Sequence, residues 1–414
     1  MININYKDCV INLGGFAMIL LKLSVSGLPL FKDKCEIDFM PRQRVTYENA
    51  EQMSRVFSDG VRNFHKNNVL SFIGINASGK TTLLKLISFS LHLLNNDPIN
   101  SIDCAEILDE LKENEQAEFE AFFYSQNNSS ISENNSGAVN YLQTVITRKK
   151  NKLVIVHETL KSKTIKKNMH KKDLLDFSLA ECIMSRQSID SEFLLDDVSI
   201  MVAFNKRNNE RFEFSDMLRN TNINELSICE DCPLEFIAFF DPSVEYLKLK
   251  DKNCNTEIRL RLKEKEEITL SRILELNRYL SSGTIKGINV FTEAVRTFKN
   301  GGYLIVDELE NHFNHEIVST LIRFYMDKKV NVGGATLIFS THYPELLDEF
   351  DRNDNIYIIK NRMGITAENL SVLLKRNDIK KSEAYQSDFL DGTVPAYEAY
   401  MDLKKSLIKK GADD

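Results

Sequence analysis

The sequence lacks an excess of positive charge. Its 414 residues carry 53 Lys and Arg against 60 Asp and Glu, which gives a formal net charge of −7 at pH 7. Proteins that hold nucleic acid through a general electrostatic field have a basic surface. This composition excludes such a global field, so any contact with nucleic acid is expected to be local or to come from a partner.

Long apolar runs are also missing, because none approaches the roughly 18 residues that a membrane-spanning helix needs. We therefore expect no membrane span. The stretch CVINLGGFAMILL after Lys7 resembles the short apolar core of a signal peptide. The alternative, which we favour, is that MILLKLSV from Met18 forms a first β-strand. Whether translation starts at Met1 or at Met18 stays open.

The seven cysteines are odd in number and irregularly spaced, which is not typical of a disulfide framework. Reduced thiols in the cytoplasm are the expectation. Cys229 and Cys232 have the C-x-x-C spacing, but a zinc site needs two more ligands and the sequence has no second pair. We expect non-ligating thiols, with zinc as the alternative.

Short apolar runs alternate with helical patterns in two parts of the chain. Four such runs read as buried strands, at residues 69–73, 303–306, 335–339 and 356–360. Strands that alternate with helices predict a mainly parallel sheet and hence an α/β fold. A chain of this length fits one large domain or two to three ordinary ones.

Two stretches depart from this alternation. Residues 116–160 show the pattern of antiparallel strands, and residues 161–234 turn charged and read as a mainly helical insertion. Residues 1–160 and 235–414 are then the two parts of one larger domain. The run LEFIAFF, which starts at Leu234, is expected to be a strand.

Residues 74–81 read GINASGKT, the full G-x-x-x-x-G-K-[ST] pattern of a phosphate-binding loop. A strand is predicted before it and a helix after it, as that loop requires. Lys80 would bring a positive charge to the β- and γ-phosphates, and the Thr81 hydroxyl would bind Mg²⁺. The residues expected to hold the phosphates are Gly74, Asn76, Ala77, Ser78, Gly79, Lys80, Thr81 and Thr82.

Two carboxylates follow the strand at 303–306, in the stretch YLIVDELE. Asp307 is suited to hold Mg²⁺, directly or through water, and Glu308 to polarise the attacking water as general base. The alternative is an acidic helix N-terminus, where Asp and Glu are common. The phosphate loop upstream favours the catalytic interpretation.

His342 follows another predicted strand, in TLIFSTHYPEL, where it could reach the γ-phosphate. A lone histidine after a strand is more often structural. Its position one strand-helix-strand unit after Asp307 favours a catalytic role.

In this chain order the motifs resemble those of ABC-type ATPase heads, above all the SMC and RecF-like branch and the bacterial abortive-infection and OLD-type ATPases. LSSGT, residues 280–284, is similar to the L-S-G-G-Q signature of that family, from which Ser282 and Thr284 depart. The resemblance implies a P-loop NTPase fold of the ABC-head type, with a mixed, mainly parallel sheet and an antiparallel β subdomain. It also implies that Ser281, Ser282 and Gly283 cap ATP bound to a second copy of the chain.

Two features stay open. The resemblance implies a glutamine loop, for which Gln116, Gln126 and Gln143 are all candidates. The run Lys161–Lys172 holds six lysines and reads either as a solvated face or as a local contact with a nucleic-acid backbone. No aromatic residues interleave these lysines to support base stacking.

The resemblance implies an ATP- and Mg²⁺-dependent switch ATPase that dimerises around two ATP molecules. OLD-type relatives append a nuclease domain, and the stretch after 356–360 is too short to hold one. We therefore expect a separate effector, a nuclease or toxin, in bacterial anti-phage defence. The alternative is an SMC/RecF-like clamp that acts on DNA in repair or chromosome maintenance. A transporter subunit is a third and weaker interpretation.

Overall fold

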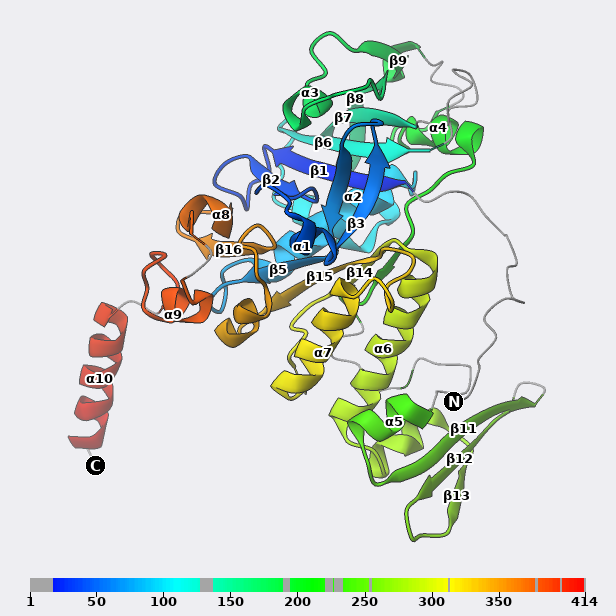
Figure 1. Ribbon diagram of the computed structural model, residues 1–414. Coiled ribbons are helices and arrows are strands. Elements are labelled where there is room, and N and C mark those ends of the chain that lie inside the picture. Colours follow the sequence, from blue (N-terminus) through cyan, green and yellow to red (C-terminus); the bar gives the residue numbers. More distant parts are fainter. Residues whose placement is uncertain are drawn as a thin grey trace.

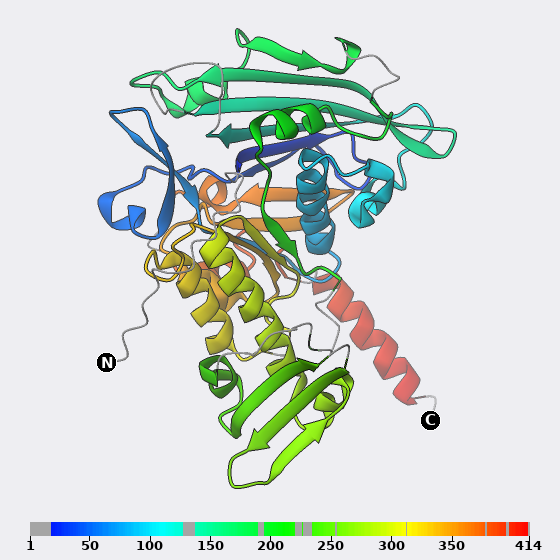
Figure 2. The same cartoon turned by 90° about the vertical axis from the view of Figure 1, so that its right-hand side faces the viewer.

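The computed structural model describes residues 18–126, 137–188, 194–219, 226, 234–252, 255–311, 313–376, 379–394 and 397–412. Within these ranges the chain forms two six-stranded sheets, a three-stranded ribbon and a hairpin. The two large sheets stack with one long helix between them, and two further long helices cover the outer face of one sheet (Figures 1 and 2).

The first large sheet is mainly parallel and has the strand order β10-β14-β15-β5-β16-β17. Only its last pair, β16 with β17, is antiparallel among the pairs of this sheet that the described residues form. Its strands are β5 (Val69–Ile73), β10 (Phe214–Asp216), β14 (Tyr303–Val306), β15 (Thr336–Thr341), β16 (Ile356–Asn361) and β17 (Ile365–Asn369). All four strands predicted from apolar runs lie here, which confirms the prediction of a mixed, mainly parallel sheet.

The second large sheet is antiparallel and has the order β2-β1-β6-β7-β8-β9. Its strands are β1 (Ile19–Ser26), β2 (Cys35–Asp38), β6 (Gln116–Ser125), β7 (Ala138–Lys149), β8 (Lys152–Thr164) and β9 (Glu181–Ser185). The antiparallel strands predicted over residues 116–160 are β6, β7 and most of β8. That prediction is confirmed.

Helix α2 (Lys80–Leu94) lies between the two large sheets (Figure 2). A helix in this position is covered on two sides, so it buries more than the single apolar face that its sequence predicts. Its buried apolar residues are Leu83, Leu84, Leu86, Ile87, Phe89, Leu91, Leu93 and Leu94. On β5, Leu70 and Phe72 belong to the core around α2, whereas Val69 and Ile73 belong to the core on the opposite face.

That opposite face of the parallel sheet is covered by α6 (Ser282–Asn300) and α7 (His315–Met326) (Figure 1). Helix α7 buries Val318, Leu321, Ile322 and Tyr325. Helix α6 packs on this face through its C-terminal half, which contributes Val290, Phe291, Ala294 and Phe298 to the core.

A β-ribbon packs with helix α5 (Leu234–Phe240) around the N-terminal half of α6 (Figure 1). Its strands are β11 (Val244–Lys252), β12 (Asn255–Leu262) and β13 (Glu267–Leu270). The expectation of a strand at LEFIAFF is wrong, because this run is α5. Phe236 and Phe240, four residues apart, both contact Phe291 of α6, with ring centroids 6.0 and 4.9 Å away. A helix brings residues at this spacing onto one face, and a short apolar run alone cannot reveal it.

The prediction that residues 161–234 are mainly helical is also wrong for the part of this stretch that the structure describes. Strand β8 continues through its beginning and pairs with β9, and the α-helices that lie wholly within its described part are α3 (Lys171–Leu175) and α4 (Met201–Asn208). Strand β10 then pairs in parallel with β14. The stretch contributes strands to both large sheets and is therefore not an independent insertion.

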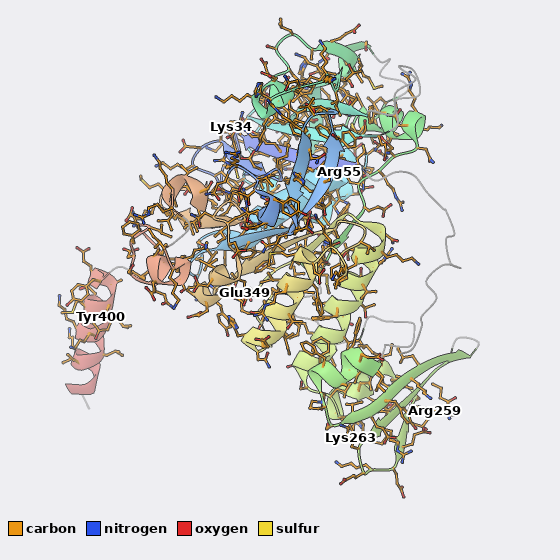
Figure 3. All side chains as sticks on the ribbon, viewed as in Figure 1. Lys34, Arg55, Arg259, Lys263, Glu349 and Tyr400 are labelled. Atoms are coloured by element: carbon orange, nitrogen blue, oxygen red, sulfur yellow. The ribbon has the colours of Figure 1, made fainter. Side chains whose placement is uncertain are left out.

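The remaining elements lie at the periphery. They are the β3 (Met53–Ser58) and β4 (Asn63–Asn67) hairpin, α1 (Tyr47–Ala50), α8 (Leu370–Leu373), α9 (Lys381–Gln386) and α10 (Tyr397–Ala412). Short 3-10 helices span Ile99–Ser101, Asp103–Leu108, Arg186–Ser188, Ile273–Arg278 and Pro344–Glu349. Helix α10, which carries Tyr400, stands apart from the sheets (Figure 3). Among the helices of the described ranges, none has the length and apolar character to span a membrane.

Candidate nucleotide site

The phosphate loop joins the end of β5 to the start of α2, as the sequence predicts. Two glycines shape it. Gly79 adopts a left-handed φ of +96°, which favours glycine. A Cβ on Gly74 would lie 2.4 Å from the carbonyl oxygen of Ile359 and 2.4 Å from Ser78 Oγ. The loop can therefore approach its neighbours this closely only because both positions lack a side chain.

Lys80 is buried and folds back over the loop that precedes it. Its Nζ donates to the carbonyl oxygens of Gly74 and Ile75 at 2.9 and 3.1 Å. Burial lowers the pKa of Lys80, and the carboxylates nearby act in the opposite direction. An ammonium group held by two weak carbonyl partners at the mouth of a helix N-terminus is positioned to exchange them for phosphate oxygens.

Asp307 lies directly beside the loop, although the two are far apart in the sequence. Its Oδ2 accepts a hydrogen bond from Thr81 Oγ1 at 2.6 Å, and its Oδ1 accepts one from Ser340 Oγ at 2.5 Å. The contacts form because β14 and β15 are parallel neighbours and β15 pairs with β5, so all three strands end at the same edge of the sheet. The structure thus brings together the two residues predicted to bind Mg²⁺, Thr81 and Asp307.

The oxygen atoms of Thr81 and Asp307 suit Mg²⁺, a hard cation that takes one or two protein carboxylates and completes its shell with substrate phosphates and water. The described residues contain no group of three or more His, Cys, Asp or Glu that could hold a metal by themselves. One carboxylate and one hydroxyl at hydrogen-bonding distance are the set that a metal bound together with a nucleotide requires.

Glu308 has a backbone conformation that is uncommon for a residue with a side chain. Its φ is +45°, in the left-handed region. Its N–H donates to Ser340 Oγ at 2.7 Å. Backbone strain of this kind persists only where the surroundings impose it, and it concentrates at functional sites.

His342 lies between Lys80 and Glu308. Its Nδ1 is 3.2 Å from Lys80 Nζ, and its Nε2 is 3.5 Å from the Glu308 carboxylate. An ammonium group can only donate, so Nδ1 accepts and the ring proton sits on Nε2, which faces Glu308. The three residues predicted to be catalytic therefore form one contiguous set.

Glu310 belongs to the site and was missed by the sequence interpretation. It is buried, and its Oε1 accepts a hydrogen bond from the backbone N–H of His342 at 2.5 Å. This contact fixes the start of the His342 loop. Its only sequence signal is its place in DELE, two residues after Glu308.

Lys286, on the first turns of α6, was missed as well. Its buried Nζ donates to the carbonyl oxygens of Glu308 and Asn311 at 3.3 and 3.0 Å. Burial lowers its pKa to about 8 despite the carboxylates around it. A lysine inside an amphipathic helix gives no sequence signal for this role, because the pattern predicts an exposed side chain.

The signature-like residues lie at the N-terminal end of α6. Ser281 is the N-cap, and its Oγ accepts a hydrogen bond from the Thr284 N–H at 3.0 Å. Ser282 and Gly283 open the helix. The N-terminal half of α6 packs with α5 and the β-ribbon, whereas the phosphate loop leads into α2 between the two large sheets.

Some lysines of the run Lys161–Lys172 are hydrogen-bonded within the protein, so fewer of them can contact a nucleic-acid backbone than the sequence suggests. Lys163 Nζ donates to the carbonyl oxygens of Asp173 and Asp176, the latter at 2.7 Å, and Lys171 Nζ donates to the carbonyl oxygen of Pro41 at 2.9 Å. Lys166, Lys167 and Lys172 are exposed.

Two other sequence features gain no role from the structure. Cys229 and Cys232 lie outside the described residues. Gln116 and Gln143 lie within β6 and β7 of the antiparallel sheet, and Gln143 donates to Glu118 there. The glutamine loop stays unassigned.

The fold and the loop define an α/β protein of the P-loop NTPase class. Residues 265–348 match the family described as "AAA domain, putative AbiEii toxin, Type IV TA system". The matched stretch contains α6, Asp307, Glu308 and His342, but not the phosphate loop. The match supports an AAA-type P-loop ATPase. A comparison with curated proteins gave no match.

Proposed function

We propose that this protein is an ATP hydrolase that works as an ABC-type switch, closing as a dimer around two ATP molecules. The observation that supports hydrolysis most directly is the position of Asp307. Its two carboxylate oxygens accept hydrogen bonds from Thr81, the last residue of the phosphate loop, and from Ser340 on the neighbouring strand. This arrangement is what a nucleotide-bound Mg²⁺ requires.

Each residue of the site then has a role in hydrolysis. The backbone amides of residues 74–81 and the Lys80 ammonium bind the phosphates, and Thr81 and Asp307 hold Mg²⁺, which neutralises charge on the phosphate oxygens. Glu308 polarises the attacking water. His342, with its Nε2 proton facing Glu308, fixes that carboxylate and lies within reach of the γ-phosphate.

The dimer is proposed from the position of the signature-like loop at the start of α6. Ser281, Ser282 and Gly283 open α6, whereas the phosphate loop opens α2, and the backbone amides at a helix start are suited to bind phosphate. A second copy can bring this loop to the phosphate loop. In this proposal, each subunit supplies the part of the site that the other lacks.

The switch is proposed to control a separate effector, a nuclease or toxin, in bacterial anti-phage defence. Support comes from the description of the matched family, which names a toxin of a type IV toxin–antitoxin system. Expression with and without the neighbouring gene product tests this. Growth arrest that requires both proteins and intact Lys80 is expected; a partner that neither co-purifies nor changes growth would contradict it.

Phosphate release by the purified protein tests the hydrolase. Lys80→Ala should lose ATP binding, because the loop loses its only side-chain charge. Glu308→Gln should keep ATP binding and lower kcat by about 10²–10⁴-fold, the usual contribution of a general base. Glu266→Gln, an exposed glutamate on the β12–β13 turn, is the matched control. Turnover by Glu308→Gln at the wild-type rate would show that Glu308 is not the base.

A further inference from the structure

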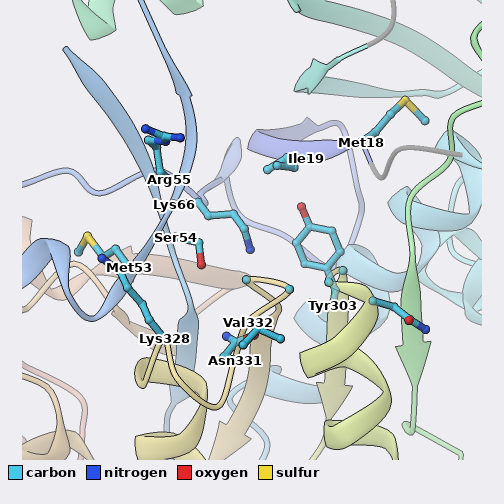
Figure 4. Close-up of a pocket in the computed structure, with 15 residues that line it drawn as sticks. Met18, Ile19, Met53, Ser54, Arg55, Lys66, Tyr303, Lys328, Asn331 and Val332 are labelled. Atoms are coloured by element: carbon cyan, nitrogen blue, oxygen red, sulfur yellow. The ribbon is translucent and has the colours of Figure 1, made fainter. Parts of the chain in front are cut away.

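A polar cavity of about 460 Å³ lies at the edge of the parallel sheet where β14 and β15 begin (Figure 4). Two pairs of glycines line the cavity. Gly301 and Gly302 precede β14, and Gly333 and Gly334 precede β15. The β3–β4 hairpin covers it and contributes Lys66.

This cavity is separate from the nucleotide site. Parallel strands all start at one edge of a sheet and end at the other. The phosphate loop follows the end of β5, and Asp307 follows the end of β14, whereas the cavity lies at the start of β14 and β15. No residue of the 74–81 loop lines it.

Lys66 points into the cavity beside the Tyr303 ring (Figure 4). Only 5% of this residue is exposed. Its Nζ donates to Thr336 Oγ1 at 2.5 Å and lies 5.7 Å from the centroid of the Tyr303 ring. Neither partner carries a negative charge, and no ion pair of Lys66 is found in the described part of the chain. Burial lowers the pKa of Lys66 to about 7.

Further basic side chains surround the same opening. Arg55 and Lys328 line the cavity, and both are exposed. Their charges also lower the pKa of the adjacent His65, for which burial is the larger cause. Lys328 also pairs with Glu51, which does not line the cavity, at 3.5 Å. Three basic and no acidic side chains line the cavity, so positive charge dominates its lining.

From this geometry we infer that the cavity binds a small molecule through a phosphate or carboxylate group held by Lys66, with Arg55 and Lys328 at the opening. A buried ammonium without a counter-ion is costly, and an oxyanion would supply the missing charge and accept its hydrogen bonds. The volume admits a molecule larger than the free anion, such as a sugar phosphate or a tricarboxylate. This inference does not depend on the proposed ATPase function.

Titration calorimetry on the full chain with inorganic phosphate, glucose 6-phosphate and citrate tests the inference. The Lys80→Ala background removes the main side-chain contact for phosphate at the nucleotide loop. At least one probe should bind, and Lys66→Met should weaken its binding tenfold or more. Arg55→Gln combined with Lys328→Gln changes only exposed residues and should weaken binding several-fold. Lys263→Gln, on the β-ribbon far from Arg55 (Figure 3), should have no effect.

The outcomes separate the possible sources of the anion. Binding of inorganic phosphate and glucose 6-phosphate but not citrate identifies a phosphate site, and the reverse identifies a carboxylate site. Failure of all three probes to bind at millimolar concentration would overturn the inference. So would binding that neither the Lys66 variant nor the Arg55 and Lys328 double variant changes.

Discussion

Lys286 Nζ lies 3.3 Å from the backbone carbonyl oxygen of Glu308, so the helix that begins at the signature-like loop contacts the residue proposed as general base. The same Nζ donates to Asn311, whose own N–H donates to Glu308 at 2.9 Å. The backbone that carries Glu308 in its left-handed conformation is thus held from α6. A movement of α6 on dimer closure would be transmitted to the Glu308 carboxylate.

Replacing Lys286 with Met should lower kcat for ATP about tenfold while the KM for ATP changes little, because no contact of Lys286 with the phosphate loop is found in the described structure. Lys286→Arg keeps a donor and should recover part of the rate. Steady-state phosphate release gives both constants. An equal rise in KM with unchanged kcat would contradict a positioning role.

Ser340→Ala should weaken Mg²⁺ binding, so that the Mg²⁺ concentration needed for half-maximal ATP hydrolysis rises about tenfold. Losses of this size are found for groups that orient a metal ligand. The substitution removes the hydroxyl that donates to Asp307 and accepts from Glu308. Magnesium titration of ATP hydrolysis measures it. Ser215→Ala, on β10 of the same sheet, loses a hydrogen bond to Glu293 and is the control. Equal effects of the two variants would mean that only general stability was lost.

Ser281→Arg should block ATP-dependent dimerisation and leave ATP binding to the monomer intact. Light scattering in the Glu308→Gln background, where the closed dimer should accumulate, is the measurement. The serine also caps α6, and losing a cap costs about 1 kcal/mol. Ser281→Ala loses the cap without adding bulk, so it should still dimerise. An ATP-dependent dimer of normal affinity in Ser281→Arg would remove the shared-site proposal.

The free energy of unfolding should rise with pH in wild type relative to Lys66→Met. Folded Lys66 has a pKa of about 7, whereas in the unfolded chain the pKa is near its ordinary 10.5. Between these values the unfolded state binds more protons, so raising the pH favours the folded state, by at most about 1.4 kcal/mol per pH unit. Urea unfolding at pH 7 and pH 9 measures this difference. A difference that does not change with pH would show that Lys66 stays charged when folded.

The nucleotide site was predictable because its main parts are local. The phosphate loop is one continuous motif, and Asp307 follows a strand whose apolar sequence identifies it. The parallel sheet then brings these pieces to one edge. The contributions of Ser340, Glu310 and Lys286 depend on strand register and helix rotation, which no short motif encodes.

The fold was predicted best where a short apolar run has clear limits, as in β5 and β14. The prediction failed where a stretch is highly charged and its apolar residues show no clear period. Residues 161–234 read as helical because they are polar and lysine-rich, yet pairing with β8 and β14 determines their structure. At LEFIAFF, packing of Phe236 and Phe240 on α6 selects a helix over a strand.

The pairing of β10 with β14 has a consequence for protein engineering. Excising residues 161–234 would uncover the β10-facing edge of Tyr303–Ile305, part of a fully buried apolar strand. An uncovered strand of this composition recruits other chains and promotes aggregation. Shortened or chimeric versions of this protein therefore need to retain Phe214–Asp216.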